Sequence, residues 1–136
     1  MSDFIAYHSA KVMGREYSVP KDGRFHWWSG KSEVFLRSAI SCRVWVVSSK
    51  LDVRPTSFRL AGMFKPTDIL PESGGYGIIG VGTAFEPTVE VTALPWFLDL
   101  RREQNNFSFG FARIRGESIV TELERILTEY EHKAVA

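Results

Sequence analysis

Apolar residues gather in short extended runs over the first two thirds of the chain and follow a helical period near its end. Residues 3–9 (DFIAYHS) and 43–49 (RVWVVSS) are rich in β-branched and aromatic side chains, which predicts a strand in each. Residues 58–68 (FRLAGMFKPTD) and 78–85 (IIGVGTAF) alternate along their length, which predicts two more. A proline inside a strand interrupts its ladder, so we expect Pro66 to end the third run or to lie at a sheet edge.

Three segments have the pattern of an α-helix. Residues 118–132 place apolar side chains on one stripe and charged side chains opposite, which makes this the clearest helix of the chain. The stripe consists of Ile119, Val120, Leu123, Ile126, Leu127 and Tyr130. Residues 95–103 (PWFLDLRRE) predict a second helix with Pro95 in its first turn. Residues 32–39 (SEVFLRSA) predict a short third helix, capped by Ser32. Its expected buried side comprises Val34, Phe35 and Ala39.

The segments between these elements carry turn residues. We expect loops over 13–25, 50–57 and 71–77, because glycine, proline or aspartate residues are concentrated there. Two further short segments, 88–92 and 107–111, have the alternation of extended structure.

The order of these elements predicts the fold class. Strands outnumber helices and follow one another without regular crossover helices, which favours an α+β fold. We expect a mixed, mostly antiparallel sheet or small barrel with peripheral helices. A chain of 136 residues fits a single domain, 1–136. Its barrel core is expected over about 3–92, and a helical and extended elaboration over about 93–136.

The net charge of +1 conceals an uneven distribution. Residues 1–60 contain ten Lys or Arg against five Asp or Glu, and residues 61–136 contain seven against eleven. The basic residues of the first part are Lys11, Arg15, Lys21, Arg24, Lys31, Arg37, Arg43, Lys50, Arg54 and Arg59. A basic rim of this kind favours an anionic partner, although an ordinary solvated surface has the same composition.

The motifs of common enzymes and cofactor sites are missing from the sequence. The three histidines have no metal-ligand spacing and Cys42 has no CxxC partner, so we expect no zinc site and no cofactor. Residues 74–77 (GGYG) lack the lysine of a P-loop, and residues 80–82 (GVG) lack the third glycine of a dinucleotide fingerprint. One cysteine permits no internal disulfide, and no run of about eighteen apolar residues is present to span a bilayer. We therefore expect a cytoplasmic protein without a membrane partner.

Residues 25–33 (FHWWSGKSE) contain the most informative pattern. Successive side chains of an extended segment face opposite ways, so Trp27 and Trp28 cannot both point into the core of such a segment. We expect one indole to pack inside and the other to face a cleft or solvent, where it can form a stacking wall for a flat ligand. The alternative is that both belong to the core, on the two sides of a loop.

The order of several of these segments matches a known family. Tyr7-His8-Ser9 end the opening strand, and Trp28-Ser29-Gly30 precede a short helix that ends in Phe35-Leu36-Arg37, followed by residues 40–49 (ISCRVWVVSS). In this order the chain resembles the EVE domain of the PUA-like superfamily over most of residues 3–92.

Two positions depart from the family. Ser41-Cys42 replaces its usual Gly-Asp turn, and Lys31-Ser32-Glu33 replaces an Arg-Asn-Tyr run. The resemblance implies a PUA-like barrel whose pocket accepts a base, typically a modified one, flipped out of its stack in DNA or RNA. A flipped base needs an aromatic wall to replace stacking, polar groups for its edge, and cations for the flanking phosphates.

These requirements assign candidate residues for a nucleic-acid-binding reader. The candidate base-binding residues are Trp27, Trp28, Tyr7, Ser9, Ser48 and Ser49. The candidate phosphate-binding residues are Lys11, Arg15, Lys31 and Arg37.

Two other classes of function remain open. An enzyme of related fold, such as a nuclease, needs a general base, for which His8 or His26 is the candidate, with a carboxylate such as Glu33 as partner. A protein-interaction module would use the aromatic residues and the acidic C-terminal helix as its contact surface. No nucleophile or metal motif supports the enzyme. Packing of the C-terminal helix on its own domain accounts for its apolar stripe without an interaction partner.

Overall fold

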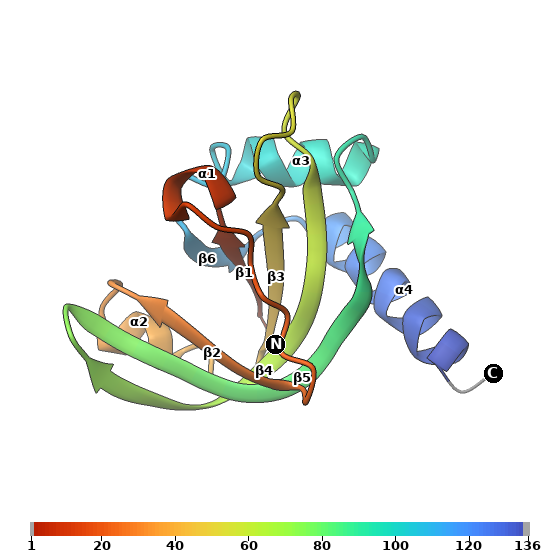
Figure 1. Cartoon of the computed structure of the whole chain (residues 1–136). Coiled ribbons are helices and arrows are strands. Elements are labelled where there is room, and N and C mark those ends of the chain that lie inside the picture. The colour runs from red at the N-terminus through yellow and green to blue at the C-terminus, as the bar shows by residue number, and fades with distance from the viewer. Residues whose placement is uncertain (1, 135–136) are drawn as a thin grey trace.

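The computed structural model describes residues 2–134, which form six strands and four helices (Figure 1). The strands are β1 (Asp3–His8), β2 (Arg24–Ser29), β3 (Arg43–Ser49), β4 (Phe58–Glu72), β5 (Gly75–Glu90) and β6 (Phe111–Ile114). The helices are α1 (Ala10–Met13), α2 (Glu33–Arg37), α3 (Pro95–Glu103) and α4 (Glu117–Ala134). None of the helices in this part of the chain is long and apolar enough to cross a membrane.

All six strands belong to one sheet in the order β2-β5-β4-β3-β1-β6. Only β1 and β3 run parallel, with His8 opposite Ser48, and every other pair is antiparallel. The α+β class and the mixed, mostly antiparallel sheet with helices around it are therefore confirmed. The expected barrel is not, because β2 and β6 are edge strands and the ladder stays open.

The long hairpin β4–β5 is the largest difference from the sequence-based expectation. Pro66 does not end β4, because a register irregularity between Pro66 and Asp68 lets the strand continue to Glu72. The expected loop over 71–77 is a tight turn between the two strands. The expected strands 78–85 and 88–92 belong to one strand, β5, which ends at Glu90. Glycines make this close pairing possible, since a Cβ on Gly82 would strike backbone atoms of β4.

Three smaller expectations are also corrected. The loop expected over 13–25 follows a short helix, α1, and ends where β2 begins at Arg24. Ser32 caps α2 as predicted, but Val34 is 83% exposed and Leu36 fills the core in its place. Residues 107–110 form a turn, and the strand of this region, β6, begins at Phe111.

Apolar side chains form one core on each face of the sheet. The helix-side core lies under α3 and α4 and includes Ile5, Trp45, Val47, Phe58, Leu60, Phe97, Leu100, Phe107, Ile119, Leu123 and Ile126. The hairpin-side core lies under α2 and includes Phe4, Ala6, Phe25, Leu36, Val44, Val46, Phe64, Ile69, Ile78 and Phe111. The alternation of β1 and β3 feeds both cores, and β6 extends the sheet beside β1.

The short helix α2 lies along the edge strand β6, and we call this line of contact the seam. Lys31 Nζ lies 6.0 Å from the Phe109 ring centroid, the Phe35 and Phe111 rings lie 6.2 Å apart, and Arg113 Nη2 donates to Ser38 Oγ at 3.3 Å. These pairs follow the same order along residues 31–38 and 109–113. Side chains of α2 thus join β6 to the hairpin-side core, in addition to the pairing of β6 with β1.

Candidate nucleic-acid interface

The C-terminal ends of the parallel strands bring three of the candidate serines together. Because neighbouring parallel strands end at the same edge, His8 and Ser9 lie beside Ser48 and Ser49. Ser9 Oγ caps α1 by accepting from Val12 N at 3.3 Å, and Ser49 Oγ accepts from Ala10 N at 2.9 Å. Both hydroxyls therefore fix the start of α1. Ser9 and Ser49 were assigned to the base-binding site, but the hydroxyl of each already bonds to the backbone.

Ser48 differs from the other two serines. It lies opposite His8 on the strand pair, and alternation places it on the same face as Val46 of the hairpin-side core. No side-chain hydrogen bond of its hydroxyl occurs within residues 2–134, and its side chain is 7% exposed. It is thus the candidate serine with a hydroxyl left for a ligand.

Three rings, which we call the ring row, extend from this edge: His8, Tyr17 and Trp27. The His8 and Tyr17 centroids are 5.6 Å apart, and the Tyr17 and Trp27 centroids are 5.7 Å apart. Tyr17 and Trp27 are partly buried against the hairpin-side core. Burial raises the pKa of Tyr17 to about 12, so its hydroxyl is a neutral donor at physiological pH.

His8 is fixed in one tautomer by its surroundings. Its Nε2 lies 2.9 Å from the carbonyl oxygen of Arg15, which accepts hydrogen bonds and donates none. We therefore assign the proton to Nε2, which leaves Nδ1 as the acceptor of the neutral ring. His8 is 8% exposed and ties the loop after α1 to the end of β1.

The two tryptophans of β2 point to opposite faces of the sheet, as the alternation predicts. Trp27 packs on the hairpin-side core, whereas Trp28 is 50% exposed. Trp28 and His26 share the opposite side of β2, which we call the outer face. Trp28 Nε1 donates to Ser73 O at 3.2 Å, and its ring lies against the glycines of the β4–β5 turn. The two indoles cannot serve one pocket, and only Trp27 belongs to the ring row.

Tyr7 is also separated from the ring row. Its side chain leaves β1 on the opposite face from His8 and stacks on Phe107 of the helix-side core, with centroids 4.7 Å apart. The Phe58 ring centroid lies 5.9 Å from that of Tyr7. The side chains of Tyr7 and Ser49 therefore leave their strands on the face opposite to His8 and Ser48.

The candidate cations fall into two groups. Lys11, Arg15 and Lys31 are exposed and form no ion pair with any described carboxylate. Arg37 is paired with Glu33 at 2.8 Å one helical turn away. The first group can meet a phosphate with an unpaired charge, whereas the charge of Arg37 is already opposed by Glu33.

The sequence suggested Glu33 as the carboxylate partner of a histidine general base. The structure pairs Glu33 with Arg37 instead. His26 instead lies 2.6 Å from Glu72 Oε2, in a pair that crosses over Gly77 of β5. This pair is on the outer face beside Trp28, and the His26 side chain is 55% exposed.

Sequence reasoning missed two aromatic residues of this region, Tyr17 and Phe109. Tyr17 lies in the irregular segment after α1, where no periodicity marks it. Phe109 is 48% exposed beside Lys31, and the next residue accepts a hydrogen bond from Tyr7 N at 2.9 Å, which places Phe109 at the end of β1. The Phe-rich pattern of 107–111 was the available signal, and it predicted a strand.

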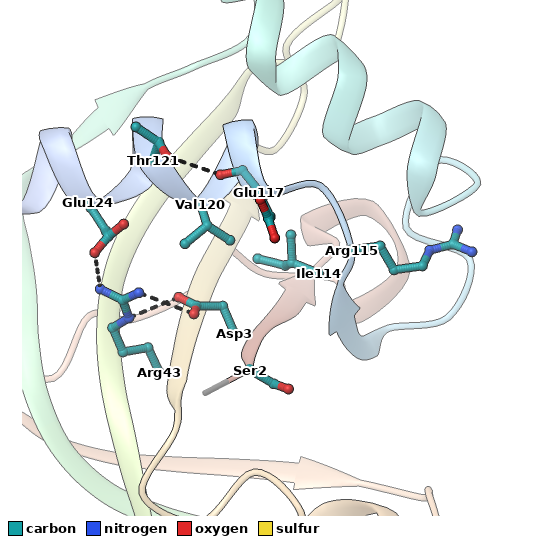
Figure 2. A pocket seen from close by; sticks show the side chains of 9 residues that line it. All are labelled: Ser2, Asp3, Arg43, Ile114, Arg115, Glu117, Val120, Thr121 and Glu124. Carbon is teal, nitrogen blue, oxygen red and sulfur yellow. Dashed lines mark hydrogen bonds and ion pairs between the residues drawn. The ribbon is translucent and has the colours of Figure 1, made fainter.

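The cavities characterised on the described surface lie elsewhere. One of about 340 Å³ is lined by Asp3, Arg43 and the first turns of α4 (Figure 2). A second, of about 460 Å³, lies between α3 and α4. Within residues 2–134 no cluster of three or more His, Cys, Asp or Glu side chains has the arrangement of a metal site.

No protein-family model and no curated protein matches this chain.

Proposed function

We propose that this chain binds DNA or RNA as a reader domain and holds one unstacked base against the ring row. The observation that carries the proposal is the ring row itself, which meets the ends of the parallel strands β1 and β3. Aromatic side chains replace the stacking that a base loses when it leaves its helix. Because Tyr17 and Trp27 are packed against the hairpin-side core, they would present a rigid face to the base.

Polar and charged groups around the ring row support the same proposal. The Ser48 hydroxyl and the protonated Tyr17 hydroxyl can both hydrogen-bond the edge of a base, which carries donors and acceptors. Lys11 and Arg15 follow β1, and Lys31 follows β2, so free cations flank the ring row along the chain. Such contacts supply affinity without sequence choice.

The resemblance to the EVE domain predicts this function independently of the geometry. A PUA-like fold, recognition of a modified base and a cytoplasmic location are parts of the same proposal. The sheet described above has an open ladder, so the proposal rests on the ring row and does not need a closed barrel.

The experiment compares Trp27→Ala with Trp28→Ala, two neighbouring tryptophans on opposite faces. Binding of fluorescent single-stranded DNA and RNA, with and without modified bases, is measured by anisotropy at about 50 mM salt, where phosphate contacts are strong. We expect Trp27→Ala to weaken binding between about 5-fold and about 150-fold, the usual range for one stacked base. Trp28→Ala should bind like the unaltered protein.

A second variant separates loss of stacking from loss of folding. Trp27 is partly buried, so Trp27→Phe, which keeps an aromatic face, is expected to bind and melt close to the unaltered protein. The proposal fails if the unaltered chain binds no oligonucleotide at this salt concentration. It also fails if Trp27→Ala and Trp28→Ala weaken binding equally while both variants keep their melting temperatures.

A further inference from the structure

The side chain of Phe109 is exposed in a segment whose other phenylalanines are buried. Phe107 is 6% exposed and Phe111 is 2% exposed, whereas Phe109 between them is 48% exposed. Strict strand alternation would put all three rings on one face. The turn before β6 therefore separates Phe109 from its neighbours and directs it to the surface.

The backbone of this turn adopts an unusual conformation. Asn105, Asn106 and Phe107 have φ values of 50°, 55° and 62°, and Gly110 has a φ of 72°. The left-handed region is tolerated by asparagine and glycine but unfavourable for phenylalanine. Three successive residues in this region are maintained only where surrounding contacts hold them.

Those contacts are present and fix the turn from both sides. Arg101 Nε and Nη2 donate to Asn106 Oδ1 at 3.1 and 3.0 Å, and Tyr7 N donates to Gly110 O at 2.9 Å. The Phe107 ring stacks on Tyr7 inside the helix-side core. Phe109 is thus an exposed ring on an anchored turn, so little conformational freedom is lost when a ligand stacks on it.

The charge beside Phe109 selects the kind of ligand. Lys31 Nζ lies 6.0 Å from the ring centroid and forms no ion pair with a described carboxylate. Lys31 follows Trp27 of the ring row by four residues, and Phe109 lies at the same end of β1 as His8. An exposed ring next to a free cation is the combination that binds successive nucleotides of a single strand.

We infer that Phe109 is a second stacking position, which takes the nucleotide next to the base held by the ring row, with Lys31 contacting the phosphate between them. The ligand is single-stranded, because bases inside a duplex do not expose their faces to a surface ring. This inference rests on the proposed function, since it extends the same interface along the seam by one nucleotide.

The test is a length series measured by intrinsic fluorescence. Thymidine 5′-monophosphate and oligothymidylates of two and four nucleotides are titrated into the unaltered chain, Phe109→Ala and Trp28→Ala. Trp28→Ala is the matched control, because it also removes an aromatic ring that is about half exposed but lies on the outer face. For the unaltered chain and the control, affinity should rise from the mononucleotide to the dinucleotide.

Phe109→Ala should bind the mononucleotide unchanged and lose most of the gain on lengthening, by about 5-fold or more. Lys31→Ala should lower the slope of log affinity against log salt by about 0.7, the value for one phosphate contact with a single strand. The inference is overturned if Phe109→Ala binds every length like the unaltered chain. Absence of binding by the unaltered chain at all lengths would instead contradict the proposed function, and this inference with it.

Discussion

Replacing Asp3 by alanine tests how α4 is held against the sheet. Asp3 is 4% exposed, and its Oδ2 accepts from Trp45 Nε1 at 2.7 Å. Arg43 Nη2 donates to Oδ1 at 3.2 Å, and Arg43 Nε lies 2.9 Å from Oδ2 as an ion-pair contact without hydrogen-bond alignment. Arg43 Nη1 in turn donates to Glu124 of α4 at 2.9 Å, so the network joins β1, β3 and α4 (Figure 2).

The loss on Asp3→Ala has two physical sources. Trp45 is fully buried, so its indole N–H loses its acceptor where water does not reach it, which costs about 1–3 kcal/mol. Burial opposes the charge of Arg43, but its hydrogen bonds to Glu124 and Asp3 outweigh burial and raise the pKa of Arg43. An arginine stays charged at neutral pH, so the substitution leaves a charge without its Asp3 partner. The cost is limited because Arg43 keeps Glu124 and is 21% exposed. We expect a total loss of about 3 kcal/mol, at the lower end of the range for breaking a buried pair.

Urea denaturation followed by far-ultraviolet circular dichroism measures this loss. A domain stable by about 5–15 kcal/mol survives it, so the folded variant remains measurable. Asp3→Asn keeps an oxygen for the Trp45 N–H but loses the charge, and should fall between Asp3→Ala and the unaltered protein. Glu124→Ala removes a carboxylate that is 49% exposed and should cost no more than about 1 kcal/mol.

The comparison between the two carboxylates is the decisive result. If Asp3→Ala costs no more than Glu124→Ala, burial and the Trp45 hydrogen bond contribute nothing measurable, and the reasoning is wrong. If Asp3→Asn is as destabilised as Asp3→Ala, the charge of Asp3 matters and its hydrogen bond to Trp45 does not.

Two further predictions concern the hairpin and the ring row. Gly82→Ala should cost about 1–3 kcal/mol, because its Cβ would strike the backbone of Met63 and Phe64. Gly77→Ala should cost less, because the atoms nearest to its Cβ are the ends of the Glu72 and His26 side chains, which can move aside. Equal losses in urea denaturation would contradict this reading of the hairpin. The raised pKa of Tyr17 means that the folded state keeps a proton which the unfolded state releases above about pH 10. Stability should therefore fall as the pH rises from about 10 to about 12, and Tyr17→Phe should lose less stability over this range; tyrosinate absorbance against pH gives the pKa directly.

Periodicity predicted the elements whose burial follows a simple rule. The strands β1 and β3 and the helices α3 and α4 were all found near their expected bounds. Strands were predicted within β4 and β5, but the extent of this hairpin was mispredicted because proline and glycine usually interrupt strands. Here Pro66 lies at a register irregularity, and glycines of β5 lie where β4 approaches most closely. Both explanations depend on the partner strand, which local sequence does not reveal.

The candidate site was predictable only where a residue belongs to a regular element. Alternation in β2 separated Trp27 from Trp28, and the shared edge of β1 and β3 brought Ser48 to His8. Tyr17 was out of reach because an irregular segment carries it to Trp27. The exposure of Phe109 could not be predicted, because consecutive left-handed residues before it change the side to which its ring points from the one that strand alternation gives.

The positions of the histidines weigh against the enzyme alternative. A general base needs a free lone pair within reach of the reacting proton. His8 belongs to the ring row and keeps the Nδ1 lone pair when Nε2 donates to Arg15 O, but the residue is only 8% exposed, which restricts the approach of a substrate. His26 is exposed and paired with Glu72, yet it lies on the outer face of β2, opposite Trp27. The exposed imidazole–carboxylate pair and the rings that would hold a base are thus on opposite faces of one strand, an arrangement that favours binding over cleavage at the ring row.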